Sequence, residues 1–303
     1  MNDPLTLTDL ESWSRPGVSL AVLGHPIKHS VSPAMHNAAL DALARTEPAF
    51  ADWRYFRFEV HPDDLPRALE LLHAKRFRGV NLTVPHKIIA FDRVAAVDQA
   101  AQPIGAVNTL LWTERGWCGH NTDGYGLAAA VHETLGRDLA GAHIILLGAG
   151  GAARGAAVEC LQRRCASLWI ANRTAENLAK LLATLAPIAE GIAVRGFAPA
   201  EIPADLPAGT LVINATSAGL KPADPLPINL AALPRPAAVF DMIYNPPMTP
   251  LLHAAAQLGV PHAHGLTMLV HQGAKALEIW SGISATRTAP TMAAAARAAM
   301  SVA

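Results

Sequence analysis

The stretch HIILLGAGGAARGAAVECL, residues 143–161, joins an apolar run to a glycine-rich turn and a series of small residues. The apolar run predicts a buried strand, and the alanine-rich part predicts a helix. Gly148, Gly150 and Ala153 have the spacing that lets a pyrophosphate lie against the backbone amides of a helix N-terminus. The alternative, a tight turn that binds nothing, accounts less well for the flanking strand and helix. We therefore predict a dinucleotide site made by residues Gly148, Ala149, Gly150, Gly151 and Ala152.

The next predicted strand, SLWIANRT at 167–174, carries no acidic residue at its end. A dinucleotide with a free 2′-hydroxyl usually meets Asp or Glu at this position. Asn172, Arg173 and Thr174 offer hydrogen-bond donors instead, and a guanidinium is a permanently charged, planar partner for a phosphate. The strand end therefore favours NADP(H) over NAD(H). Without its position relative to Gly148, Arg173 would be read as an ordinary solvated arginine.

Two further apolar runs, TLVINATSAG at 210–219 and AVFDMIYNP at 238–246, predict buried parallel strands that end in polar residues. In an open α/β sheet the carboxyl ends of the strands line the ligand crevice. We expect these polar ends near the nicotinamide half of the cofactor, in the form of Asn214, Thr216, Ser217, Asp241, Met242 and Tyr244.

The first half of the chain alternates between strand and helix patterns. Strands are predicted at 18–24, 53–60, 79–84 and 104–112, and helices at 32–43, 62–76 and 127–136. Ser32 is expected as a helix N-cap, and the segment 121–126 is expected as a turn. This alternation predicts an α/β fold with two domains.

The opening strand of the motif GVNLTVPHK, 79–87, has an apolar and a polar face. Val80, Leu82 and Val84 form the apolar face because side chains alternate along a strand. Pro85 is expected to end the strand because it has no amide donor.

Composition limits the classes of partner. The chain has 303 residues, is 51% hydrophobic, and has 24 basic and 24 acidic side chains, so it lacks the global charge typical of nucleic-acid or membrane binding. Its three cysteines have neither zinc-site nor disulfide-framework spacing, and no signal peptide or apolar span is recognisable. We expect a soluble cytoplasmic protein with no metal, and we leave monomer or homodimer open.

Nine motifs in order resemble the shikimate dehydrogenase family, from about Leu23 to about Gly282. They are GHPIKHSVSPAMHN, GVNLTVPHK, GAVNT, NTDG, GAGGAAR, NRT, NATS, DMIYNP and GLTMLVHQGA. The resemblance implies reversible, NADPH-linked reduction of 3-dehydroshikimate to shikimate on the route to chorismate and the aromatic amino acids. It also implies a substrate domain with a mixed sheet, 1–123 and 265–303, and a Rossmann-like NADP domain, 124–264, separated by a cleft.

The same resemblance assigns site residues. Lys87 is implied as the catalytic acid/base and Asp123 as the carboxylate that orients it, although a coupled pair need not assign its proton to one member. Substrate contacts are implied for Ser30, Ser32, Asn81, Thr83, Lys87, Asn108, Asp123, Tyr244 and Gln272, and cofactor contacts also for Thr216, Ser217, Met242 and Gly265.

Departures from the family pattern keep other readings open. Glu176 and Asn177 stand where a second basic residue is common, which weakens strict NADP selectivity, and the roles of His86 and His271 are unassigned. A quinate or aminoshikimate dehydrogenase of the same family is the nearest alternative. An NADP-binding sensor without turnover is the alternative from a different class.

Overall fold

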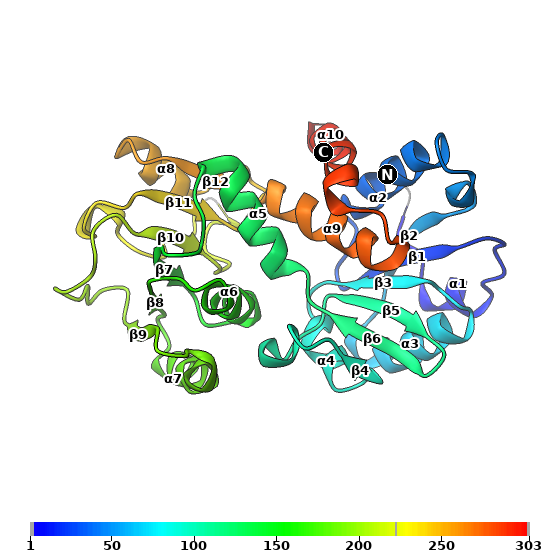
Figure 1. Cartoon of the computed structure of the whole chain (residues 1–303), viewed down its shortest axis with the longest axis horizontal. Coiled ribbons are helices and arrows are strands. Elements are labelled where there is room, and N and C mark those ends of the chain that lie inside the picture. Colours follow the sequence, from blue (N-terminus) through cyan, green and yellow to red (C-terminus); the bar gives the residue numbers. More distant parts are fainter. Residues whose placement is uncertain (1–2, 222, 302–303) are drawn as a thin grey trace. The chain divides into compact units, whose positions relative to one another are not determined.

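The computed structural model describes residues 3–221 and 223–301, which form two compact units (Figure 1). The first unit comprises the chain up to Thr122 together with the part from Val270 onward, and the second is Asp123–Leu269. Each unit contains one six-stranded sheet with helices, so the prediction of a two-domain α/β fold class is confirmed.

The sheet of the first unit is mixed. Its strand order is β2 (Arg54–Glu59), β1 (Ser19–Gly24), β3 (Gly79–Leu82), β5 (Thr109–Thr113), β6 (Gly116–His120) and β4 (Ala96–Val97). The pairs β1/β2, β1/β3 and β4/β6 are parallel, whereas β3/β5 and β5/β6 are antiparallel. The strand β3 therefore lies near the middle of the sheet, which explains why all four of its residues are buried.

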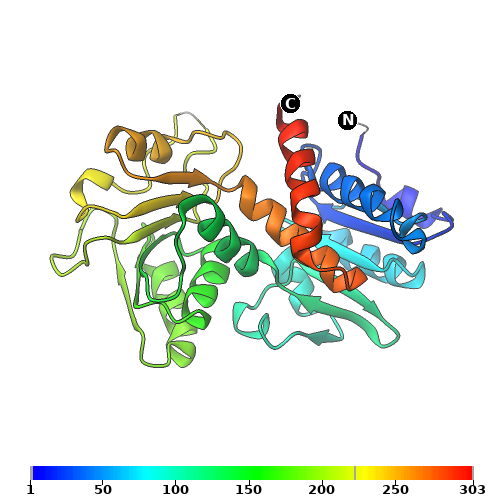
Figure 2. The ribbon, with the colours of Figure 1, turned by 45° about the horizontal axis from the view of Figure 1, so that its top comes forward.

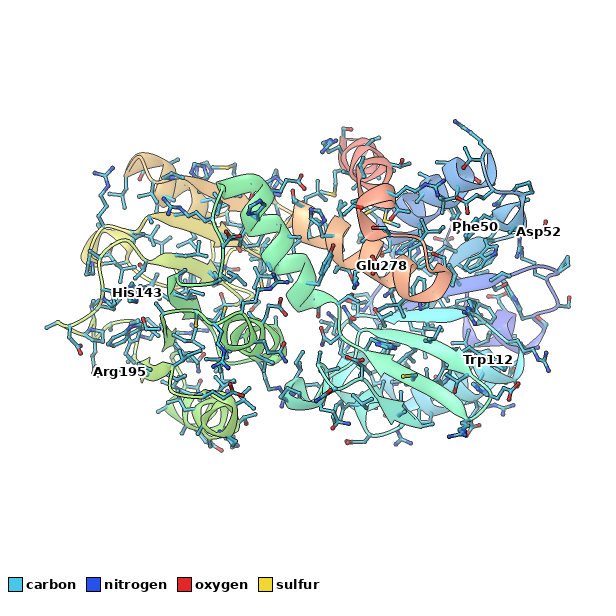
Figure 3. All side chains as sticks on the ribbon, in the orientation of Figure 1. Phe50, Asp52, Trp112, His143, Arg195 and Glu278 are labelled. Carbon is cyan, nitrogen blue, oxygen red and sulfur yellow. The ribbon has the colours of Figure 1, made fainter. Side chains whose placement is uncertain are left out.

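Six α-helices belong wholly or partly to the first unit within the described residues. They are α1 (Leu7–Glu11), α2 (Ser32–Ala44), α3 (Leu65–Ala74), α4 (His86–Phe91), α9 (Leu266–Ser281) and α10 (Ala285–Ser301), with short 3-10 turns at 48–50, 62–64 and 102–104. Figure 2 shows the C-terminal helix α10 alongside α2, and the two helices are in contact. Glu278 on α9, labelled in Figure 3, accepts a 2.7 Å hydrogen bond from the backbone of Ala285 and so fixes the turn into α10.

The sheet of the second unit is entirely parallel. Its strand order is β12 (His262–His264), β11 (Ala238–Asp241), β10 (Leu211–Asn214), β7 (His143–Leu147), β8 (Ser167–Ala171) and β9 (Ala193–Phe197). The described helices are α5 (Asp123–Leu135), α6 (Gly151–Gln162), α7 (Ala175–Leu185) and α8 (Pro250–Gln257), with 3-10 turns at 186–188 and 230–232. The order reverses at β7, as in a doubly wound dinucleotide fold.

Two expectations for the motif GVNLTVPHK are wrong, and the helix that follows it was not predicted. The strand β3 ends at Leu82, before Pro85, and Val84 is 71% exposed, so Val84 does not belong to the apolar face. Lys87 lies in the first turn of α4, a helix that the sequence did not predict. Helices this short depend on their surroundings more than on propensity, which is why pattern alone misses them.

Other boundaries also differ from the predictions. Ser32 is the first residue of α2 and Val31 is the N-cap. The strand predicted at 104–112 begins only at Thr109, so Asn108 precedes β5. The expected turn at 121–126 is wrong from Asp123 onward, because α5 begins there. Gly124 lies inside this helix. A Cβ there would stand 2.3 Å from Glu159 Oε2 on α6, so the absence of a side chain permits close packing of α5 against α6.

No helix in the described parts of the chain has the length and apolarity needed to cross a membrane. Cys118, Cys160 and Cys165 are free thiols.

Candidate active site

The two serines of the motif HSVSP follow β1: Ser30 precedes α2 and Ser32 begins it. Ser30 is half-buried and Ser32 is buried, and the amide of Ser32 donates to Ser30 Oγ at 3.3 Å. The guanidinium of Arg57 on β2, only 9% exposed, donates to the backbone carbonyls of Lys28 and Ser30. A buried cation therefore holds the backbone that carries the serine pair. Sequence reasoning missed Arg57, whose only signal was a charge between the aromatic residues Phe56 and Phe58 of β2.

Asn81 and Asn108 belong to one buried hydrogen-bond network in the first unit. Tyr55 Oη donates to Asn81 Oδ1 at 2.8 Å, and Asn81 Nδ2 donates to the Asn108 carbonyl at 3.1 Å and to Thr109 Oγ1 at 3.0 Å. Asn108 Oδ1 accepts from Thr109 Oγ1 and from the amide of Thr122, both at 2.9 Å. The network thus links three strands to the residue that precedes Asp123.

This network changes the interpretation of Asn81. The residue is 7% exposed, and its amide nitrogen uses both hydrogens inside the network. Its oxygen already accepts one hydrogen bond from Tyr55. Asn81 therefore acts mainly as a support for Asn108 and Thr109, with at most one acceptor position left for a ligand.

The backbone around Lys87 is tied to the same region. The Val107 amide donates to the Lys87 carbonyl at 2.9 Å, which brings the first turn of α4 beside the segment that contains Asn108. Thr83 is held by its amide, which donates to the Leu23 carbonyl at 3.0 Å. The side chains of Thr83 and Lys87 are both half-buried. The structure therefore places the segments that carry Thr83, Lys87 and Asn108 next to one another in the first unit.

Two predicted residues come from helices at the limits of the units. Asp123 is the first residue of α5 and is bonded to Thr122, whose backbone amide is fixed by Asn108. Gln272 lies on α9, next to Gly273, where a Cβ would stand 3.3 Å from His36 Nε2. Both side chains are half-buried.

His86 is a fully buried residue beside Lys87. Burial lowers the pKa of its imidazole, an effect that the backbone of Val60 partly opposes, and His25 and His61 lower it further. Its amide donates to the Thr83 carbonyl at 2.8 Å, which closes the turn into α4. A neutral, enclosed imidazole at this position supports the local fold of the segment that carries Lys87.

The glycine-rich turn of the second unit fits a pyrophosphate. Gly148 has φ +109°, a backbone conformation that favours glycine, and a Cβ there would meet Thr216 Cγ2 at 3.1 Å. Gly150 is the N-cap of α6 and makes no side-chain capping bond, and a Cβ added there would meet nothing within 4 Å. Gly151 and Ala152 form the first turn of α6, where backbone amides have no intrahelical acceptor, and the space next to Gly150 is open, as an anion site requires.

The residues proposed for the adenosine end follow β8. Asn172 Nδ2 donates to the Thr174 carbonyl at 2.8 Å, and Thr174 is the N-cap of α7. The Arg173 side chain between them is exposed. Glu176, which follows in the first turn of α7, forms an ion pair with Lys180, the two atoms being 2.6 Å apart.

The carboxyl ends of β10 and β11 are joined by a buried network. Asn214 and Asp241 have no exposed surface, and Asn214 Nδ2 donates to Asp241 Oδ1 at 3.0 Å. Thr249 Oγ1 donates to Asp241 Oδ2 at 2.7 Å, and Thr216 Oγ1 donates to Asn214 Oδ1 at 2.7 Å. Asn214 and Asp241 therefore hold the strand ends and do not face a ligand, whereas Ser217 beside Thr216 is exposed.

Met242, Tyr244 and Gly265 lie close together at this end of the second unit's sheet. A Cβ at Gly265 would stand 2.0 Å from the Met242 carbonyl oxygen, so only glycine permits this approach. The Gly265 amide donates to the Ile243 carbonyl at 3.0 Å. Burial raises the pKa of Tyr244 above its ordinary value, which keeps its hydroxyl protonated as a donor.

A doubly wound parallel sheet with an open glycine turn, joined in one chain to a mixed-sheet unit, is typical of nicotinamide-dinucleotide-dependent oxidoreductases. No cluster of His, Cys, Asp or Glu suited to a metal occurs among the described residues.

Comparisons with known proteins specify the class. A family profile described as the shikimate dehydrogenase substrate binding domain matches residues 22–110, and one described as the shikimate 5'-dehydrogenase C-terminal domain matches residues 265–296. The shikimate dehydrogenase (NADP(+)) of Magnetococcus marinus is 40% identical over 267 residues, which cover 88% of this chain and 91% of that protein. That of Moorella thermoacetica is 41% identical over 268 residues, covering 87% and 88% of the two chains.

Solved structures agree in fold. Shikimate 5-dehydrogenase from Thermus thermophilus, in complex with NADP(H) and shikimate, has a TM-score of 0.80 at 34% identity and covers 93% of this chain and 100% of its own. The ligand-free 5-ketofructose reductase of Gluconobacter sp. has a TM-score of 0.77 at 31% identity and covers 92% and 99%. The chain belongs to the shikimate dehydrogenase family.

Proposed function

We propose that this protein is an NADP-dependent shikimate dehydrogenase that reversibly reduces 3-dehydroshikimate to shikimate on the route to chorismate and the aromatic amino acids. The observation that carries the proposal is likeness over nearly the whole chain to proteins of that name, 40% identical in the case of Magnetococcus marinus. The presence of Lys87 and Asp123 in their motifs argues against a sensor without turnover.

The two domains expected from the sequence divide the work under this proposal. The mixed-sheet domain, 1–123 and 265–303, binds the substrate, and the parallel-sheet domain, 124–264, binds NADP(H). The glycine turn at Gly148–Ala152 would hold the pyrophosphate, and Arg173 would pair with the 2′-phosphate. Thr216, Ser217, Met242 and Gly265 would surround the nicotinamide half, which supplies or accepts a hydride when the cofactor is bound.

Substrate recognition rests on neutral hydrogen-bonding groups. Ser30 and Ser32 would bind the carboxylate, and the nearby Arg57 guanidinium adds a favourable potential at that position. Thr83, Asn108, Tyr244 and Gln272 would bind ring hydroxyls, because hydroxyls and amides suit a ligand that carries several alcohol groups.

Proton transfer is assigned to Lys87 Nζ. Reduction of the ketone leaves an alkoxide, and an ammonium group donates a proton to it and stabilises its charge. In the reverse direction the neutral amine accepts the proton from the alcohol. Asp123, at the start of α5, orients the lysine and the substrate hydroxyl.

We infer a cytoplasmic location, because all three cysteines are free and biosynthetic oxidoreductases act on metabolites of the reducing cytosol.

The test is reduction of NADP⁺ by shikimate, followed by absorbance of the reduced nicotinamide. We expect turnover by the wild type and a loss of about 100-fold or more in kcat for Lys87→Ala, the usual range for removal of an acid/base group. Lys75→Ala is the matched control, since it removes another lysine of the same unit, one that donates to the Trp13 carbonyl at 3.0 Å. Near-normal turnover by Lys87→Ala would refute the assignment of the proton donor.

Parallel assays separate the alternatives. Quinate, aminoshikimate and 5-ketofructose are each tested with NADP(H) and with NAD(H). The sugar 5-ketofructose is included because a 5-ketofructose reductase shares this fold at 31% identity. A higher kcat/KM on any of them than on shikimate would replace the proposed substrate. Binding of NADPH with no turnover of any substrate would favour the sensor.

A further inference from the structure

The buried network around Asn108 contains a hydroxyl with no assigned function. Thr109, the first residue of β5, is completely buried, and its side chain lies between the two amides of Asn81 and Asn108. A hydroxyl has one hydrogen to donate and can accept from the other side, so its place between two amides defines a direction for that hydrogen.

The direction follows from backbone groups whose roles are fixed. The amide of Thr122 can only donate, so the Asn108 atom that lies 2.9 Å from it must be the oxygen. The backbone carbonyl of Asn108 can only accept, so the Asn81 atom 3.1 Å from it must be the nitrogen. Asn81 Nδ2 then donates to Thr109 Oγ1, which leaves the Thr109 hydrogen for Asn108 Oδ1 at 2.9 Å, a better hydrogen bond than the 3.4 Å contact with Thr122 Oγ1.

The direction of the Thr109 hydrogen determines which hydrogen-bonding groups Asn108 can offer a ligand. Its oxygen has two lone pairs, which the Thr122 amide and the Thr109 hydroxyl fill at 2.9 Å, and the Thr122 hydroxyl lies 3.2 Å from the same oxygen. Tyr55 anchors the far end of the chain of bonds by donating to Asn81 Oδ1 at 2.8 Å. Asn108 can therefore offer a ligand only N–H hydrogens, and its Nδ2 also donates to Thr122 Oγ1 at 3.1 Å.

We propose that Thr109 is a positioning residue that locks the Asn108 amide with Nδ2 toward the substrate, so that the substrate hydroxyl must accept at Asn108 and send its own proton elsewhere. This inference rests on the proposed function and deepens it. A hydroxyl that accepts from Asn108 has its hydrogen free for the carboxylate or amine that performs proton transfer. Rotation of the amide by half a turn would present an acceptor and compete for that hydrogen.

Thr109→Val tests the inference because valine keeps the shape and removes the hydroxyl. We expect kcat/KM for shikimate to fall about 10- to 100-fold, as for other small losses of positioning, while KM for NADP⁺ stays within about twofold. Thr109→Ser restores the hydroxyl and should recover most of kcat/KM. The pH profile of kcat should also change in Thr109→Val and recover in Thr109→Ser, because the substrate proton has lost its fixed direction.

Thr210→Val is the matched control. Thr210 is also completely buried, but its hydroxyl has no hydrogen-bond partner among the described residues, and it lies just before β10 in the other unit. We expect wild-type kinetics from this variant. Thr109→Ala, which also lacks the hydroxyl, replaces Thr109→Val if the latter does not fold, and thermal unfolding reports the folded fraction of each variant.

The outcomes distinguish this inference from the proposed function. A wild type without turnover on shikimate overturns both. An active wild type together with a Thr109→Val protein, or its Ala substitute, of unchanged kcat/KM and pH profile overturns the inference alone. A fall in melting temperature without a kinetic change assigns Thr109 a purely structural role and also overturns it.

Discussion

Gly79 lies directly beneath the indole of Trp280: a Cβ at Gly79 would stand 2.1 Å from Trp280 Nε1. The indole donates to the Leu110 carbonyl at 2.9 Å, and Arg78 Nε donates to the Trp280 carbonyl at 3.0 Å. The glycine that opens β3 thus lets the last turn of α9 pack on the first unit's sheet. This contact joins segments that lie far apart in the chain.

Gly79→Ala is therefore expected to destabilise the first unit by about 1–3 kcal/mol, because an added methyl overfills a packed core. The measurement is urea unfolding followed by tryptophan fluorescence. Gly209→Ala is the control: it adds the same methyl to an open turn with φ +70°, where only backbone strain of about 1 kcal/mol is expected. Equal losses at both positions would show that the Trp280 contact does not limit the size of residue 79.

His36 makes the stability sensitive to acid. It is completely buried, stacks on Tyr55 with 4.1 Å between ring centroids, and its burial lowers the pKa to about 3 from an ordinary 6.5. Since the unfolded chain binds the proton more readily, stability is full above pH 6.5 and falls as the pH drops from 6.5 toward 3. At about pH 5 this group alone should remove about 2 kcal/mol of the free energy of unfolding.

His36→Phe keeps the ring and removes the titration, so its loss of stability between neutral pH and about pH 5 should be smaller than that of the wild type by this amount. Urea unfolding at the two pH values gives the difference. His253→Phe makes the same exchange at an exposed position of α8 and should keep the wild-type dependence. If His36→Phe loses as much stability as the wild type, another group carries the acid sensitivity.

Arg173 should determine the choice of cofactor. Arg173→Ala removes the guanidinium proposed for the 2′-phosphate, and loss of a charge-assisted hydrogen bond of about 1.5–3 kcal/mol would raise KM for NADP⁺ roughly 10- to 100-fold. KM for NAD⁺ should stay constant, because that cofactor lacks the phosphate. The exposed Arg137 serves as control through Arg137→Ala. An equal rise in KM for both cofactors would argue that Arg173 acts on something other than the phosphate.

Thr249 should stabilise the buried carboxyl of Asp241. Burial raises the pKa of Asp241, and the hydrogen bond from Thr249 opposes that rise. Thr249→Val removes this bond and the N-cap of α8, which accepts from Leu252 N at 3.3 Å, so a loss of about 2–4 kcal/mol is expected. The raised pKa means that the ionised carboxyl opposes folding, so the deficit should grow as the pH rises from acid to neutral.

Thr249→Ser keeps the hydroxyl and should lose less than about 1 kcal/mol. Thermal unfolding across the pH range compares the two variants. A deficit in Thr249→Val that does not depend on pH would assign the loss to the helix cap alone.

The sequence by itself predicted the elements whose signal is local. The glycine turn at Gly148 and Gly150, the strand before it and the helix after it are confirmed, because tight turns and apolar periodicity depend on neighbours in the chain. Motif order also led to the family, which the comparisons show. The individual assignments of Lys87, Asp123 and the other site residues remain predictions.

Tertiary structure decided what depends on groups distant in sequence. The amide of Asn81 reads as a ligand group in GVNLTVPHK, but Tyr55 on β2, Thr109 on β5 and the carbonyl of Asn108 just before β5 occupy it. The helix α5 includes Gly124 because α6 packs against it, although the sequence there reads as a turn. Local patterns thus predicted the turns and the strands and helices next to them. Which polar residues can face a ligand was decided by tertiary structure, because distant partners saturate the buried polar groups.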